Sequence, residues 1–93
     1  MGSKLSAVRR RIDRLDERLL RLLSQRARLA LDIGRIKKRR KWPVFDASRE
    51  AVVLRHVARV NTGPLSARAV HRIFQAILRE YRRRERSSKK RKT

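Results

Sequence analysis

The sequence contains no cysteine, which excludes disulfide bonds, thiol nucleophiles and cysteine-ligated metals. The two histidines, His56 and His71, are far apart and form no metal-ligand pattern, so no metal is expected. Aromatic residues make up only 4% of the chain, so the core has to be built from leucine, valine, isoleucine and alanine. Nothing in this composition indicates metal, redox or covalent nucleophilic chemistry.

Long apolar runs are also missing. No run approaches the ~20 residues that span a bilayer, and the N-terminus "MGSKLSAV" lacks the apolar stretch of a signal peptide. We therefore expect no membrane association and a cytoplasmic, reducing location. Acidic residues are scarce, with 8 Asp and Glu against 29 Lys and Arg, which gives a formal charge of +21. Such a surface attracts polyanions non-specifically, so charge alone does not identify a ligand.

The hydrophobic pattern predicts an all-α chain of three helices in one small domain, because no stretch alternates as strands do. The helices are expected from about Ser6 to Arg40, from Ala47 to Val60 and from Ala67 to Arg86. Asp46 and Ser66 are the predicted N-caps of the second and third helices. Residues 6–86 form the predicted domain, residues 1–5 a short N-terminal extension, and residues 87–93, "SSKKRKT", a basic tail expected to be disordered.

Apolar residues recur along the first helix at alternating steps of three and four, the pattern of a helix packed along its length against another. They are Leu5, Val8, Ile12, Leu15, Leu19, Leu22, Leu29, Ile33 and Ile36. The shorter helices cannot cover a helix of ~50 Å, so the stripe predicts a second copy of the chain. Val53, Val57 and Val60 on the second helix, and a stripe from Val70 to Tyr81 on the third, are the other predicted buried residues.

One stripe position is polar: the residue four after Leu22 is Arg26. Lys37 follows 11 residues later, about three helical turns, so it shares that face at a distance of ~16 Å. Two such cations could bracket an anionic small molecule. Alternatively, a polar residue in an apolar seam can fix the register of two helices. Gly34, between them, is expected to allow close packing against a neighbouring backbone.

The motifs "VRRRIDRLDERLLRLLSQRARLALDIGRIK", "PVFDASRE" and "LSARAVHRIFQAILREYRRRE" resemble those of the all-helical, dimeric three-helix chorismate mutases. The resemblance covers residues 5 to about 86. It rests on two arginines in the long helix, a Gly-x-x-Lys near its end, an Asp-x-x-Arg-Glu at the start of the second helix and a Phe-x-x-Ile in the third. It implies an intertwined antiparallel homodimer with shared active sites.

The resemblance also implies a role for each matching residue. Arg26 would bind one carboxylate of chorismate, and Arg9 of the other protomer would bind the second carboxylate. Lys37 would donate to a carboxylate and to the ether oxygen. Glu50 would accept from the ring hydroxyl near Asp46, and Arg49 would line the pocket. Arg9 lies 17 positions before Arg26, about a quarter turn away from whole turns, so one helix face cannot bring both to one site.

Two positions on the third helix depart from the family pattern, with Tyr81 where serine is common and Glu85 where glutamine is common. A carboxyl group at 85 donates to the ether oxygen only when it is protonated. We therefore expect activity to rise as the pH falls below neutral, and Glu85→Gln to change that profile. Arg82, Arg84 and Arg86 argue the other way, because nearby cations favour the charged carboxylate.

The implied activity is an isomerase reaction, the Claisen rearrangement of chorismate to prephenate in the shikimate pathway of aromatic amino-acid biosynthesis. This reaction requires no cofactor, but it requires bidentate arginines that hold the substrate and donors aimed at the ether oxygen. Three alternatives stay open: an isochorismate pyruvate-lyase on the same scaffold, a basic nucleic-acid-binding module, and a structural helical dimer. Residues "TGPLSARAVHRIF" are weakly similar to a helix-turn-helix.

Overall fold

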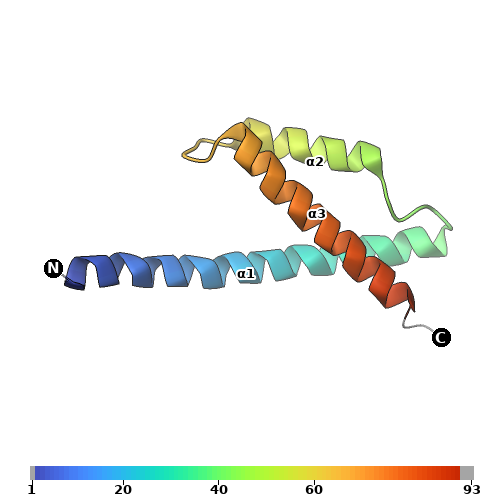
Figure 1. Ribbon diagram of the computed structural model, residues 1–93. Helices are drawn as coiled ribbons and strands as arrows, with labels where there is room; N and C mark the ends of the chain where they lie inside the picture. Colours follow the sequence, from blue (N-terminus) through green and yellow to red (C-terminus); the bar gives the residue numbers. More distant parts are fainter. Residues whose placement is uncertain (1, 91–93) are drawn as a thin grey trace. The chain divides into compact units, whose positions relative to one another are not determined.

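The computed structural model describes residues 2–90, and the side chains of residues 2–86. It contains three helices, α1 (Gly2–Arg39), α2 (Ala47–Val60) and α3 (Ala67–Lys90), and residues 2–90 include no strand (Figure 1). The all-α fold expected from the sequence is therefore confirmed. No helix in this range is long and apolar enough to cross a membrane.

The chain divides into two compact units, Met1–Asp32 and Ile33–Thr93. The first unit holds most of α1. The second holds the last turns of α1 together with α2 and α3, which pack against each other as a helical hairpin (Figure 1). Its buried core consists of Val53 on α2 and of Val70 and Leu78 on α3, each 8% exposed. A core this small is typical of a chain that buries little surface by itself.

Polar side chains define the ends of the helices. Asp46 caps α2, because its carboxylate Oδ1 accepts from the backbone N–H of Arg49 at 3.0 Å. Ser66 caps α3 in the same way, with Oγ accepting from the N–H of Ala69 at 3.0 Å. After α2 the chain turns at Gly63, whose φ of +81° lies in the left-handed region that glycine adopts without strain. Both predicted N-caps are confirmed.

Four boundary and burial predictions need correction. Helix α1 begins at Gly2 rather than near Ser6, and α3 continues to Lys90 rather than ending at Arg86. Residues 87–90 are therefore helical, not disordered, and residues 91–93 lie outside the described residues. Arginine, lysine and glutamate are good helix formers, so α3 continues past its last apolar residue. Two residues predicted to be buried are exposed. Val60 is 57% exposed, because it ends α2 beside the turn, and Ile73 of the α3 stripe is 46% exposed.

Candidate active site

The first turn of α2 presents three of the predicted site residues. Asp46 is occupied as the N-cap, and Glu50 starts the backbone ladder with an N–H that donates to the Asp46 carbonyl at 3.1 Å. Asp46 and Arg49 are exposed, whereas Glu50 is partly buried. A carboxylate in the first turn is favoured by the helix dipole. The capped turn therefore fixes the Glu50 side chain at the α3-facing side of the hairpin, where it pairs with Arg82.

Lys37 lies in the last turn of α1 and is partly buried. Its ammonium Nζ donates to the backbone carbonyl of Val44, at 3.1 Å, and its own carbonyl accepts from the N–H of Trp42 at 2.8 Å. Lys37 thus binds the linker between α1 and α2 through its side chain and through its backbone carbonyl. An ammonium group has three donors, so two N–H groups remain for a ligand beside the one that Val44 uses.

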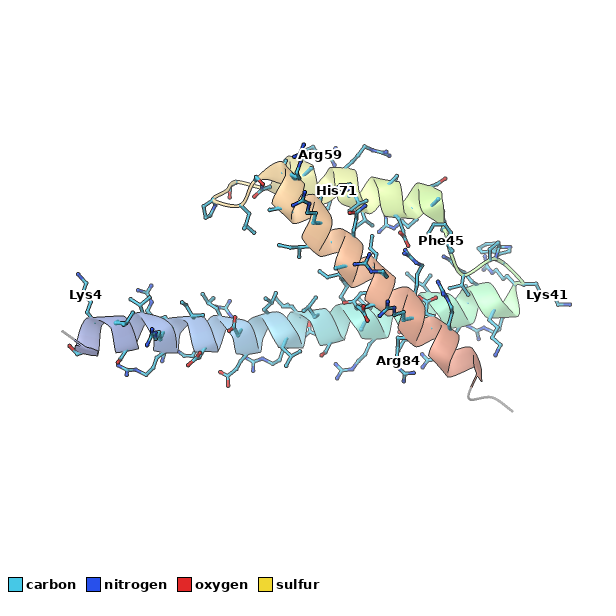
Figure 2. All side chains as sticks on the ribbon, viewed as in Figure 1. Lys4, Lys41, Phe45, Arg59, His71 and Arg84 are labelled. Atoms are coloured by element: carbon cyan, nitrogen blue, oxygen red, sulfur yellow. The ribbon has the colours of Figure 1, made fainter. Side chains whose placement is uncertain are left out.

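Helix α3 contributes Tyr81, Arg82 and Glu85, all partly buried. Arg82 forms a salt bridge with Glu50 through Nη1 and Oε2, and its guanidinium carbon lies 5.0 Å from the centre of the Phe45 ring. Figure 2 shows Phe45 in the linker just ahead of α2. Arg82 therefore connects α3 both to the linker and to the first turn of α2.

Glu85 lies over Gly34 of α1. A Cβ built on Gly34 would be 3.5 Å from the carboxyl carbon and from Oε2 of Glu85. Gly34 was predicted to pack closely against a neighbouring backbone. This prediction is wrong about the contact, because the group that lies against Gly34 in this chain is the Glu85 side chain. Because Gly34 and Lys37 are three residues apart on one helix, the contact brings Glu85 to the end of α1 that carries Lys37.

These contacts bring together, within the second unit, the end of α1, the linker, the start of α2 and the last turns of α3. The predicted residues that lie on these segments are Lys37, Asp46, Arg49, Glu50, Tyr81 and Glu85. Arg9 and Arg26 belong to the first unit. Arg26 is partly buried, whereas Leu22 and Leu29 beside it in the stripe are 60% and 65% exposed, and Arg9 is exposed. The described residues include no group of His, Asp and Glu suited to a metal ion.

Sequence reasoning missed Arg82, which it treated only as a cation near Glu85. The signal was available in the α3 stripe. Leu78 is buried, and the residue four positions later on the same face is Arg82. The rule that singled out Arg26, a cation at a position where the periodicity expects an apolar residue, applies equally to Arg82.

Comparison with known proteins identifies the class of small helical enzymes to which this all-α chain belongs. The family model "Chorismate mutase type II" matches residues 8–86. The chain therefore belongs to the type II chorismate mutase family.

Individual relatives agree with this assignment. The bifunctional chorismate mutase/prephenate dehydratase of Pseudomonas aeruginosa is 46% identical over 80 residues, which cover 81% of this chain and 22% of that protein. The chorismate mutase of Methanocaldococcus jannaschii is 36% identical over 53 residues, 57% of this chain and 54% of that protein. The chain spans about a fifth of the length of the bifunctional relatives that it matches.

A solved structure supports the fold over almost the whole chain. Form II of the chorismate mutase from Thermus thermophilus superimposes with a TM-score of 0.87 at 31% identity. The alignment covers 89% of this chain and 94% of that one. The likeness in fold therefore extends over nearly the whole of both chains.

Proposed function

We propose that this chain is an isomerase that converts chorismate to prephenate by a Claisen rearrangement. The observation that carries the proposal is the family match over residues 8–86, which includes every residue proposed for the site. The reaction is a single-substrate pericyclic step, so binding geometry and electrostatics have to supply the catalysis. A cluster of fixed cations and carboxylates on rigid helices suits that task.

In the proposed mechanism the arginines hold the substrate in its compact reactive conformation. Arg26 binds one carboxylate as a bidentate fork, and Arg9 of a second copy binds the other. Lys37 donates to the ether oxygen, on which negative charge grows as the C–O bond breaks. Glu85, in its protonated form, is the second donor to that oxygen, and Glu50 accepts from the ring hydroxyl. Asp46, Arg49 and Tyr81 complete the proposed binding site.

The proposal includes a homodimer with shared sites. None of the residues of α1, all of which the structure describes, is buried in the single chain. The stripe residues Leu15 and Leu19 are each 56% exposed. Continuous exposed apolar surface of this kind on a soluble chain marks an interface. An antiparallel pair of α1 helices would cover the stripe and would bring Arg9 of one chain to the site of the other. The cytoplasmic location stays a prediction.

A product assay on the purified protein tests the function. Wild type and Arg26→Leu are compared for prephenate formation from chorismate, and for pyruvate and salicylate formation from isochorismate. We expect prephenate from the wild type, and from Arg26→Leu a folded protein of equal or higher stability with little turnover, because leucine removes a seam charge. Pyruvate and salicylate as the products would favour the lyase. Unchanged turnover in Arg26→Leu would remove this arginine from the site.

A further inference from the structure

Arg82 and Glu50 form an ion pair between α3 and α2 that is only 24% exposed on each side chain. The guanidinium group also lies over the Phe45 ring, 5.0 Å from its centre. Arginine can form both contacts at once, because its planar group stacks on an aromatic face and donates along its edge. The Arg82 side chain is therefore held at two points, and it binds the Glu50 carboxylate through Oε2.

A second arginine pair on α3 shows that this arrangement is not a general property of the helix. Arg83 pairs with Glu80 at 3.3 Å, one turn away on the same helix, and these side chains are 67% and 61% exposed. Exposed pairs of this kind contribute little and are screened by salt. Two adjacent arginines thus carry the same charge in two different environments, and only Arg82 contacts a residue of the proposed site.

We propose that Arg82 is a positioning residue that orients the Glu50 carboxylate and neutralises its charge. The proposal rests on the proposed function, in which Glu50 accepts from the ring hydroxyl of a doubly anionic substrate. An unpaired carboxylate there would repel the two substrate carboxylates, and a half-buried site screens that repulsion less than open water does. The salt bridge uses Oε2 of Glu50, and Oε1 of the same carboxylate can accept from the hydroxyl.

A double-mutant cycle tests the proposal through substrate affinity. Arg82→Gln should raise KM about tenfold and leave kcat within about twofold, because orientation and charge balance act on the bound ground state and the transition state alike. In a Glu50→Gln background, where an acceptor oxygen remains and the charge is gone, Arg82→Gln should change KM less than about twofold. Arg82→Lys should recover part of the loss, since it restores the charge without the planar stacking group.

Arg83→Gln is the matched control, because it removes the same charge from the neighbouring position of the same helix. Its KM should stay within about twofold of wild type at moderate ionic strength. An equal rise in KM for Arg83→Gln would show a general charge effect and overturn the proposal. An equal effect of Arg82→Gln in both backgrounds would also overturn it, because Arg82 would then act without Glu50.

The same cycle measured by urea unfolding separates this proposal from the proposed function. Arg82→Gln should change the unfolding equilibrium constant at least threefold more in the wild-type background than with Glu50→Gln. A wild type that shows this coupling but forms no prephenate overturns the proposed function and, with it, the role of Arg82. An active wild type without coupling in either measurement overturns the role of Arg82 alone.

Discussion

The two compact units of this chain differ in what covers their apolar side chains. In the second unit, Val53, Val70 and Leu78 are each 8% exposed, because α2 and α3 pack against each other. In the first unit, Leu15 and Leu19 on α1 are each 56% exposed. Isolated helices are marginally stable in water unless an apolar face is packed. The second unit therefore has a core of its own, whereas no described residue of the first unit is buried.

A charge placed on the exposed apolar stripe of α1 should have the largest effect, because it acts on the unit that has no buried residues among those the structure describes. Leu15→Glu removes one leucine from each chain of the proposed dimer interface. Burial of each leucine contributes about 1.5–3 kcal/mol to association. We expect the dimer dissociation constant to rise by roughly 10²–10⁴-fold, measured by sedimentation equilibrium, with activity lost in parallel. Arg10→Glu is the control: it changes the charge more, at an exposed position two residues before Ile12 and thus on the opposite side of α1. A dimer unaffected by Leu15→Glu would contradict the predicted seam.

A substitution in the second unit should remove catalysis and leave association unchanged. Lys37→Ala deletes the proposed donor to the ether oxygen, and loss of one such donor typically costs ~3–4 kcal/mol. We expect kcat to fall by roughly 10²–10³-fold with an unchanged helical circular dichroism signal and an unchanged dimer. Lys38→Ala, at the exposed neighbouring lysine of the same turn, should retain near wild-type kcat. Activity near wild type in Lys37→Ala would remove Lys37 from the proposed role.

The smallest expected effect is at the contact between α1 and Glu85. Gly34→Ala should stabilise the protein by about 1 kcal/mol, the difference in helix propensity, because the added Cβ would meet Glu85 at the ordinary contact distance of 3.5 Å. Urea unfolding measures this gain. Gly34→Leu should instead displace the Glu85 carboxyl group and lower turnover. Destabilisation by alanine would mean that this contact is tighter than the structure has it.

The bounds of α2 could be predicted from sequence because a local signal marks each end. Asp46 accepts from the N–H of Arg49 at one end, and Gly63 turns the chain soon after the other. The far end of α3 carried no such signal. Its last residues have nothing apolar to pack, and no glycine or proline stops the helix, so α3 continues through Ser87 and Ser88 to Lys90.

The family motif indicates candidate site residues from the sequence, but it does not indicate the contacts between helices. Periodicity places Lys37 on a face of α1, but the bond from Nζ to the Val44 carbonyl depends on how the linker folds back. Similarly, Glu50 and Arg82 are far apart in the sequence, and no local pattern indicates which of the many arginines pairs with this carboxylate. Such pairings are set by the packing of α3 on α2.

The bond between Lys37 and Val44 has a consequence for conformational entropy. A free lysine side chain loses up to about 2 kcal/mol of rotamer freedom when it is fixed. Here the Val44 carbonyl restricts the ammonium group as part of folding. The loss of side-chain entropy is therefore taken up during folding and does not reduce the affinity for substrate. A variant with a longer or more flexible 40–46 segment would bind substrate more weakly, although the residues that contact the substrate are unchanged.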